Sequence, residues 1–358
     1  MARFAVSCGG TGGHVFPGVA TAQALKQRGH DVVLLLAGRS IEAAARFSWE
    51  GPVLNTGAAE IVFKPSRFFP GVLRLARSYF CCLAAFRRQK PAALLAMGSY
   101  SSAGPVLAAA TVRVPVILHE ANVIPGRATA AFAGLAKVIA ISFPETAGHL
   151  APHSCAMTGL PLRRELEQAA AGAHESAGAP VLLVMGGSQG AQRLNEMAPQ
   201  VVAAVHKTGV SLQVIHLAGS RDRDAVQRAY TVARIPAEVH GFCHDMASAY
   251  RRATFAISRS GANSCLELAA FGVPALLVPY PHSARDHQTA NAQAMAASGA
   301  ADCLAQDKMS LAKLSEYLMS RLIDANTLDR MRAAATRRAC NGAAERLADL
   351  VEQVTVPR

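Results

Sequence analysis

A short apolar run followed by a glycine-rich loop occurs twice in this sequence, and the two copies lie almost half the chain apart. Residues 3–8 (RFAVSC) lead into GGTGG at residues 9–13, and residues 180–185 (PVLLVM) lead into GGSQG at residues 186–190. Each loop precedes an amphipathic stretch that is typical of a helix. A strand, a loop and a helix in this order begin a doubly wound α/β sheet, so the repetition predicts two such sheets in tandem.

The other apolar runs favour the same fold class. They are continuous and do not alternate with polar residues, which is typical of strands covered on both faces in a parallel sheet. They occupy residues 31–37, 93–97, 114–118, 137–141, 212–217, 254–257 and 275–278. The length of 358 residues is also about twice the ~150 expected of one domain. We therefore expect an α/β protein with two Rossmann-like parallel-sheet domains facing a deep cleft, with a surface link near residues 168–180.

Composition excludes several classes of protein. Hydrophobic residues make up 51% and charged residues 17% of the chain, which excludes a disordered or coiled-coil protein. The net charge of +12 favours a polyanionic partner without identifying it. Eight cysteines occur without a CxxC pair, so we expect buried reduced thiols and no metal site built on them.

The sequence contains no stretch that predicts a membrane span. The N-terminal apolar run is too short for a signal peptide. The longest uncharged stretch, residues 91–112, is interrupted by glycine, serine and proline, so it does not form the continuous apolar helix of ~20 residues that crosses a bilayer. We expect a cytosolic protein whose membrane contact is peripheral.

The two glycine loops indicate anion binding. At the carboxyl edge of such a sheet, unpaired backbone N–H groups and the helix dipole favour a phosphate, although a tight turn needed only for packing is the alternative for either loop. A nicotinamide dinucleotide site is disfavoured, because GGTGGH lacks the GxGxxG spacing and the second strand ends in Ala37-Gly38-Arg39 without an acidic residue. A P-loop is excluded by the absence of GxxxxGK[ST].

Two polar segments follow apolar runs in the second half. Residues 258–264 (SRSGANS) open a helix that carries Glu267. Small residues at a helix start suit a phosphate, and a carboxylate two turns later suits the vicinal diol of a ribose. The alternative is a capping box with Ser264 as the cap and Glu267 three residues on, and the spacing does not choose between them. The many hydrogen-bonding groups of residues 280–291 indicate a hydroxyl-rich ligand such as a sugar.

Five motifs occur in order along the chain. They are GGTGGHVFPG (9–18), HEANVIPG (119–126), GGSQGA (186–191), SRSGANSCLELAAFGVPALLVPYP (258–281) and DHQTANA (286–292). Together they resemble the MurG family, the N-acetylglucosaminyltransferases that make lipid II from lipid I in peptidoglycan synthesis. The resemblance implies a GT-B fold, UDP-N-acetylglucosamine (UDP-GlcNAc) as donor and undecaprenyl-diphosphate-MurNAc-pentapeptide as acceptor. It also implies an inverting transfer in which the acceptor C4 hydroxyl displaces UDP.

The resemblance also implies different roles for the two domains. Residues 1–160 would form an N-terminal domain for the acceptor and for membrane docking, and residues 161–340 a C-terminal domain that binds UDP-GlcNAc. A helix over residues 341–358 would pack back on the N-terminal domain.

Individual roles follow from the same motifs. The resemblance implies that the donor is bound by Thr11, Gly12, Gly13, Asn122, Arg163, Ser188, Glu267, His287 and Gln288. It implies that the acceptor diphosphate lies against Gly10, Thr11, Gly12, Gly13, Ser99 and Tyr100. No metal or other cofactor is expected, because no DxD motif is apparent; Arg163 and helix N-termini would meet the charge on the departing UDP.

An inverting displacement needs a base whose pKa lies near the working pH. His14, directly after the first glycine loop, is the candidate, since histidine titrates near neutrality. Glu120 in HEANVIPG is the rival. The alternative for His14 is a histidine at a helix start that orients a phosphate or packs.

Two segments depart from the family pattern. The family's TGNPVR reads TGLPLR at residues 158–163, so an amide contact is lost. The family's GGY reads Gly98-Ser99-Tyr100, so one glycine near the acceptor loop is replaced.

Residues 64–88 combine basic and aromatic residues without a single acidic one. A basic amphipathic stretch of this kind docks on anionic lipid, whereas an ordinary helix with one core face is the alternative. Because the implied acceptor is lipid-linked, we expect docking at the cytoplasmic face of the inner membrane. The docking residues would be Arg67, Phe68, Phe69, Leu73, Arg74, Arg77 and Phe80. No nucleic-acid partner is expected, because no recognition motif occurs.

Other functions share the implied fold. A UDP-sugar diacylglycerol glycosyltransferase and a UDP-GlcNAc 2-epimerase are alternative enzymes, and a UDP-sugar-binding membrane scaffold without catalysis is the alternative outside enzymes. Cell-wall assembly proteins are further partners that the resemblance leaves open.

Overall fold

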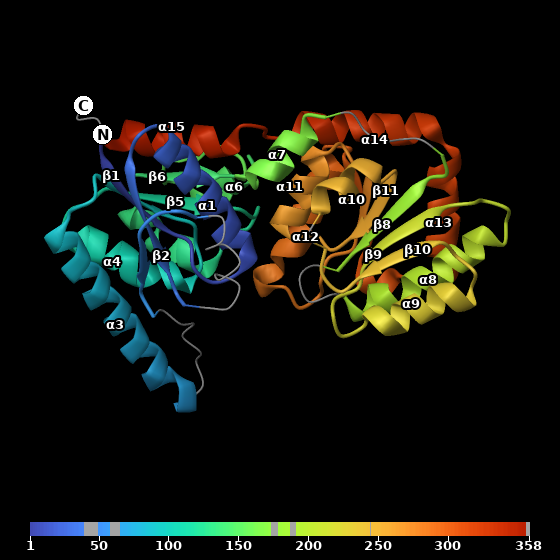
Figure 1. The fold of residues 1–358 in the computed structure, drawn as a ribbon, viewed down its shortest axis with the longest axis horizontal. Helices are drawn as coiled ribbons and strands as arrows, with labels where there is room; N and C mark the ends of the chain where they lie inside the picture. Colours follow the sequence, from blue (N-terminus) through green and yellow to red (C-terminus); the bar gives the residue numbers. More distant parts are fainter. Residues whose placement is uncertain (39–48, 58–64, 173–177, 187–190, 244, 356–358) are drawn as a thin grey trace. The chain divides into compact units, whose positions relative to one another are not determined.

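The computed structural model describes residues 1–38, 49–57, 65–172, 178–186, 191–243 and 245–355, and of residues 65–68 and 70 only the backbone. The chain divides into two compact units (Figure 1). Unit 1 comprises residues 1–164 and 340–358, and unit 2 comprises residues 165–339. The boundary expected at residue 160 lies just before the first of these divisions.

Unit 1 contains a parallel sheet whose described strands have the order β3-β2-β1-β4-β5-β6-β7. They are β1 (Arg3–Ser7), β2 (Asp31–Leu36), β3 (Val53–Asn55), β4 (Ala93–Ala96), β5 (Val116–Glu120), β6 (Val138–Ile141) and β7 (Cys155–Met157). The direction of chain order reverses between β1 and β4. The loops after these two strands therefore begin at the point of the carboxyl edge where doubly wound sheets bind ligands.

Helices cover the faces of this sheet. They are α1 (Gly12–Gln27), α3 (Pro65–Arg88), α4 (Ala103–Thr111), α5 (Arg127–Phe132), α6 (Thr146–Leu150) and α15 (Ala343–Thr355). Successive residues of β1 enter different cores: Phe4 and Val6 pack with α1 and α15, whereas Ala5 packs with Leu83 and Phe86 of α3. Both faces are buried, which is why the strand sequences do not alternate.

The C-terminal helix α15 belongs to unit 1, although all of unit 2 precedes it in the sequence. It lies beside α1 (Figure 1), and its residues Leu347, Ala348 and Val351 are each 0% exposed. The helix therefore completes the core on one face of the unit 1 sheet.

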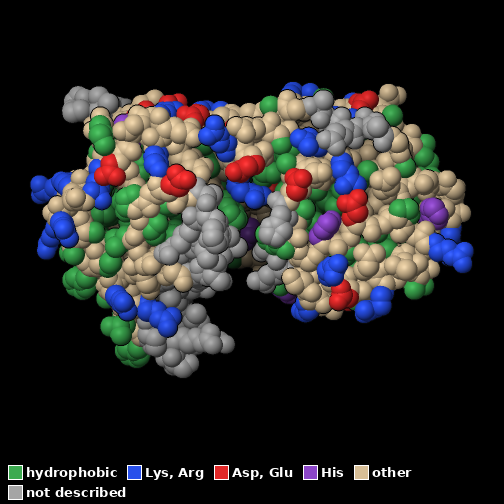
Figure 2. Space-filling model, viewed as in Figure 1, with side chains coloured by type: hydrophobic (Ala, Val, Ile, Leu, Met, Phe, Trp, Pro, Cys, Tyr) green, Lys and Arg blue, Asp and Glu red, His purple; other side chains and the backbone are tan. Residues whose placement is uncertain are grey.

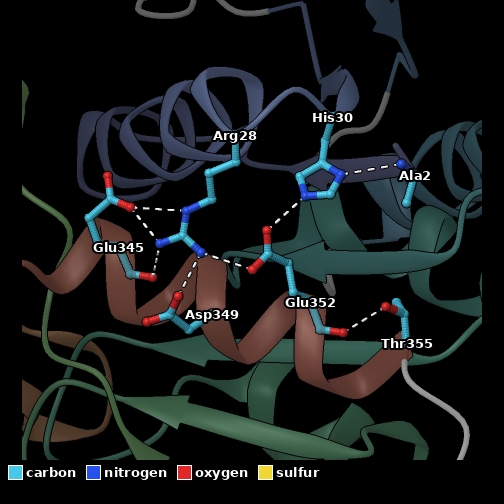
Figure 3. Close-up of polar contacts among 7 residues, drawn as sticks. All are labelled: Ala2, Arg28, His30, Glu345, Asp349, Glu352 and Thr355. Atoms are coloured by element: carbon cyan, nitrogen blue, oxygen red, sulfur yellow. Dashed lines mark hydrogen bonds and ion pairs between the residues drawn. The ribbon is translucent and has the colours of Figure 1, made fainter.

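A cluster of charges joins α15 to the end of α1 (Figure 3). The Arg28 guanidinium contacts the carboxylates of Glu345, Asp349 and Glu352 at 2.5, 2.6 and 2.9 Å. His30 Nε2 donates to the other oxygen of Glu352 at 2.7 Å. Burial opposes the charge of Arg28, but hydrogen bonds to Glu345 and Asp349 outweigh this effect and hold its pKa above the usual range, so the arginine stays charged.

Unit 2 contains a second parallel sheet, with described strands in the order β10-β9-β8-β11-β12-β13. The strands are β8 (Val181–Met185), β9 (Gln213–Leu217), β10 (Ala237–His240), β11 (Phe255–Ser258), β12 (Ala275–Leu277) and β13 (Ala301–Cys303). The helices are α7 (Arg164–Ala170), α8 (Gln192–His206), α9 (Arg223–Val232), α10 (Met246–Arg252), α11 (Ala262–Ala270), α12 (His287–Ala297), α13 (Leu311–Ile323) and α14 (Ala325–Arg338). The prediction of two Rossmann-like parallel sheets is confirmed.

All eight cysteines are reduced thiols, as expected, but they are not all buried. Cys8, Cys82 and Cys265 are buried, and four others are partly exposed. Cys303 is exposed, because β13 lies at the edge of its sheet. The prediction of buried thiols is therefore wrong for Cys303.

Candidate active site

In unit 1 the first glycine loop is closely packed against the loop after β4. Gly10 has φ +117°, and a Cβ there would lie 2.6 Å from Ser99 Oγ, so both the backbone and the space require glycine. Ser101 Oγ donates a 2.6 Å hydrogen bond to the carbonyl of Gly9. Ser99 itself has φ 67° and ψ 157°, a region that is strained for any residue with a Cβ. The two loops thus form one assembly at the carboxyl edge.

Helix α1 starts within this assembly. Thr11 is its exposed N-cap, and Gly12 and Gly13 form its first turn, so their backbone N–H groups are at the helix N-terminus. Thr11 Oγ1 lies 3.0 Å from His14 Nδ1. Tyr100 is half-buried in the short 3-10 helix of the second loop. Gly10, Thr11, Gly12, Gly13 and Ser99 are therefore brought together as expected from the motifs.

His14 is in the first turn of α1, and its ring lies next to Gly98. A Cβ at Gly98 would be 3.4 Å from His14 Cδ2. Desolvation lowers the pKa of His14, and the negative charge of Glu120 partly offsets that effect. The imidazole is therefore neutral at pH 7 and able to accept a proton.

Glu120 stands at the end of β5 and is only 4% exposed. Its Oε1 accepts hydrogen bonds from the backbone N–H of Asn122 at 2.9 Å and from Asn122 Nδ2 at 3.1 Å. Its Oε2 accepts from the backbone N–H of Gly126 at 2.9 Å. Both carboxylate oxygens therefore hold the HEANVIPG loop in shape, and the side chain of Asn122 is anchored by the same contacts.

His119 is a buried residue of this site to which the sequence assigned no role. Its Nε2 donates to the carbonyl of Gly159 at 3.1 Å. Burial lowers its pKa to about 4, so it is neutral. His119 thus fixes the segment TGLPLR. At the end of this segment, the guanidinium carbon of Arg163 lies 5.2 Å from the ring centre of Phe16 in α1. The sequence signal for His119 was its place in the HEANVIPG motif.

In unit 2 the second glycine loop follows β8, and Ser188 lies outside the described residues. Glu267 is half-buried on α11, and Oε2 of its carboxylate accepts a 2.7 Å hydrogen bond from the hydroxyl of Tyr250. The N-cap of α11 is Gly261, without a side-chain cap bond. The alternative of a capping box between Ser264 and Glu267 is therefore wrong, because the helix begins before Ser264.

The polar loop before α12 is held by its own side chains. Gln288 Oε1 accepts from the backbone N–H of Tyr280 at 3.0 Å, and Ser260 Oγ donates to the Gln288 carbonyl at 2.8 Å. His287 Nδ1 donates to the carbonyl of Ala284 at 2.6 Å. His287 and Gln288 thus occupy the first turn of α12, and Gln288 is tied to the loop that follows β11.

Arg259 is a further residue that the sequence did not single out. It is 7% exposed, and its guanidinium donates to the carbonyls of Val278 and Pro279 at 3.2 and 3.1 Å and to Gln306 Oε1 at 2.5 Å. Burial lowers its pKa. The sequence feature that could have indicated Arg259 is its place as an arginine among the small residues of SRSGANS.

No group of three or more His, Cys, Asp or Glu side chains in the described residues could hold a metal ion.

Helix α3 of unit 1 presents apolar and basic side chains together to solvent (Figure 2). Phe69, Leu73 and Phe80 are 78%, 72% and 63% exposed, and Arg74 and Arg77 are exposed beside them. Val72 of the same helix is also exposed. The side chains of Arg67 and Phe68 lie outside the described residues. Within the described ranges, no helix has the length and hydropathy needed to cross a bilayer.

Both halves of the chain match known domains. Residues 4–141 match the glycosyltransferase family 28 N-terminal domain, and residues 181–354 match the glycosyltransferase family 28 C-terminal domain.

Relatives match the chain over almost its full length. The UDP-N-acetylglucosamine--N-acetylmuramyl-(pentapeptide) pyrophosphoryl-undecaprenol N-acetylglucosamine transferase of Halorhodospira halophila is 39% identical, and the match covers 98% of each chain. The crystal structure of Acinetobacter baumannii MurG is 29% identical, with a TM-score of 0.80 over 98% of this chain and 99% of that one. A putative UDP-N-acetylglucosamine 2-epimerase from Listeria monocytogenes shares the fold, with a TM-score of 0.72 over 98% and 96% of the two chains, at 12% identity. The expected GT-B fold class is confirmed, and the chain belongs to the MurG family of glycosyltransferase family 28.

Proposed function

We propose that this protein transfers N-acetylglucosamine from UDP-GlcNAc to the C4 hydroxyl of MurNAc in undecaprenyl-diphosphate-MurNAc-pentapeptide, giving lipid II and UDP. The observation that carries the proposal is the 39% identity to a transferase of this name over 98% of both chains. In the reaction, the acceptor oxygen forms a bond to C1 of the donor sugar, while the bond from C1 to the UDP oxygen breaks and UDP keeps its electron pair. The hydroxyl proton passes to a base on the enzyme, and the configuration at C1 inverts.

His14 is the base in this proposal. Its imidazole is kept neutral by desolvation, as a proton acceptor must be, and the nearby charge of Glu120 stabilises the imidazolium that forms. Glu120 is less suited to the role, because both oxygens of its carboxylate already accept hydrogen bonds within the HEANVIPG loop. Its part is to hold the HEANVIPG loop and to raise the basicity of His14.

Unit 1 binds the acceptor diphosphate in the proposal. Gly10 lets the loop lie close to Ser99, Gly12 and Gly13 let the phosphates approach the backbone, and the N-terminus of α1 supplies N–H donors and the positive end of its dipole. Thr11, Ser99 and Tyr100 add hydroxyl groups at the rim of the same loops.

The donor contacts in this proposal follow from the motifs. In unit 2, Ser188 meets the diphosphate, Glu267 accepts hydrogen bonds from the ribose hydroxyls, and His287 and Gln288 contact the sugar. The carbonyl of the Gln288 side chain already accepts from Tyr280, so its amide nitrogen is the end that donates to a sugar hydroxyl. In unit 1, Asn122 reaches the sugar, Thr11, Gly12 and Gly13 line its pocket, and Arg163 contacts the nucleotide. No metal or other cofactor takes part in this scheme.

The protein works as a peripheral protein at the cytoplasmic face of the inner membrane, where its lipid-linked acceptor lies. The exposed Phe69, Leu73 and Phe80 enter the interface while Arg74 and Arg77 meet anionic headgroups, with Arg67 and Phe68 on the same helix. Proteins of cell-wall assembly are its further partners there.

The test measures UDP release with UDP-GlcNAc and a short-chain lipid I. We expect release only when both are present, with a disaccharide product. Product from diacylglycerol instead of lipid I would make the protein a different glycosyltransferase, and conversion of UDP-GlcNAc without acceptor would make it an epimerase. Binding of UDP without any turnover would indicate a scaffold.

A further inference from the structure

A hydrogen bond between side chains joins helices α10 and α11, from the hydroxyl of Tyr250 to Oε2 of Glu267 at 2.7 Å. We propose that Tyr250 is a positioning residue that orients the Glu267 carboxylate and thereby sets the affinity and selectivity for the ribose of a nucleoside diphosphate. This inference rests on the ribose-binding role of Glu267 in the proposed function.

The tyrosine is held rigidly. Its side chain is 1% exposed, and its ring lies against that of Phe271, with 5.0 Å between ring centres and an interplanar angle of 31°. Helix α10 is fixed at its start, because Asp245 accepts a 3.0 Å hydrogen bond from the backbone N–H of Ser248. The hydroxyl therefore has a defined position from which it donates to Glu267.

The hydrogen bond from Tyr250 holds the flexible side chain of Glu267 in one orientation. A glutamate has three rotatable bonds, and ordering them when a ligand binds reduces the affinity. A hydrogen bond to an ionised carboxylate is shorter and stronger than one between neutral groups. Because Tyr250 binds Oε2, it selects one orientation of the carboxylate before the diol arrives, and two vicinal hydroxyls require such an orientation.

The competing explanation is that a buried tyrosine hydroxyl only needs a partner. The chain offers a matched control for this explanation. Tyr230 in the same unit is 0% exposed, and its hydroxyl lies 3.0 Å from Nδ1 of His216, which is neutral because burial lowers its pKa to about 4. Its hydroxyl has the same need for a partner but no contact with Glu267.

The experiment compares Tyr250→Phe with Tyr230→Phe in the full-length protein. Calorimetry measures the Kd of UDP and of 2′-deoxy-UDP, and transfer assays measure the KM for UDP-GlcNAc and kcat. Tyr250→Phe is expected to raise the Kd of UDP and the KM about fivefold, with little change in kcat and a smaller preference for UDP over its 2′-deoxy analogue. Tyr230→Phe is expected to lower Tm without changing any of these ligand parameters.

A double-mutant cycle connects the two residues. On a Glu267→Ala background, Tyr250→Phe is expected to have no further effect on UDP affinity, because its effect acts through the carboxylate. A Tyr250→Phe protein that binds UDP and discriminates against 2′-deoxy-UDP as the wild type does overturns the inference. The inference is also overturned if Tyr250→Phe weakens UDP binding as much on the Glu267→Ala background as in the wild type. Wild type that binds UDP but transfers no sugar overturns the proposed function instead, and the binding data still decide the role of Tyr250.

Discussion

The backbone N–H of Gly126 donates a 2.9 Å hydrogen bond to Oε2 of Glu120, six residues earlier in the chain. With the two bonds from Asn122 to Oε1, it commits the only carboxylate of the HEANVIPG loop to the shape of that loop. We therefore assign the base of the proposed reaction to the imidazole of His14, whose pKa is lowered by burial.

The first prediction concerns His14. His14→Ala should lower kcat by about 100- to 10,000-fold, which is the usual contribution of general base catalysis, and should leave the Kd of UDP unchanged. His149→Ala serves as the control, because this histidine is exposed on α6. A His14→Ala enzyme of nearly normal rate would transfer the base role to Glu120 or to solvent.

The second prediction concerns the pH profile of Glu120→Gln. The charge of Glu120 raises the pKa of His14, so its removal lowers that pKa further. The base is active when neutral, and the acidic limb of kcat/KM should therefore move to lower pH. The plateau should fall about tenfold, because the base is weaker and the amide cannot accept from both Asn122 and Gly126. Loss of activity as large as that of His14→Ala would contradict the assignment of roles.

The third prediction concerns Gly10. A Cβ at this position would lie 2.6 Å from Ser99 Oγ, on a backbone with φ +117°. Gly10→Ala should cost about 1–3 kcal/mol in the free energy of unfolding, because an alanine is strained at this φ. It should also raise the KM for lipid I, because Ser99 must shift. Gly134→Ala is the matched control, since nothing lies within 4 Å of a Cβ there. Equal unfolding curves for the two variants would show that the loops are not closely packed.

The fourth prediction concerns Arg28. Its removal leaves Glu345, Asp349 and Glu352 without their shared cation on one face of α15. Arg28→Ala should destabilise unit 1 by about 1–2 kcal/mol, less at high salt, because partly exposed ion pairs are screened. Limited proteolysis should cleave α15 faster. Arg223→Ala is the control, since this exposed arginine pairs with its neighbour Asp224; equal proteolysis of both variants would be the contrary result.

The fifth prediction concerns membrane docking. Neutralising two cations near an anionic surface weakens binding roughly 30-fold, so reversing Arg74 and Arg77 to Glu should weaken it at least that much. Sedimentation with vesicles of anionic lipid measures the effect at low salt. Reversing Arg221 and Arg223, exposed on unit 2, is the matched control. Retention of the Arg74/Arg77 variant on the vesicles would rule out this face of α3.

Local patterns in the sequence predict much of this fold. The run at residues 254–257 predicts a strand, and β11 occupies Phe255–Ser258, because uninterrupted apolar residues have few alternatives to a buried parallel strand. The glycine loops are equally local. Gly10 is needed for its own φ, and only its close approach to Ser99 depends on the tertiary structure.

Contacts between distant residues could not be predicted in the same way. The spacing within SRSGANSCLE left Glu267 as either a cap or a ligand group, and the capping alternative fails because the helix starts at Ala262. Its bond to Tyr250, 17 residues earlier, depends on how α10 and α11 pack, which no periodicity specifies. The burial of Arg259 likewise depends on the carbonyls of Val278 and Pro279, which come from another loop.

The position of α15 has a consequence for biosynthesis. Helix α15 leaves the ribosome after all of unit 2, and it supplies Leu347, Ala348 and Val351 to the core of the first unit. One apolar face of the N-terminal sheet therefore lacks its covering helix until the whole second unit has been translated. A nonsense mutation near residue 340 would spare unit 2 and damage unit 1, most of which precedes unit 2 in the sequence.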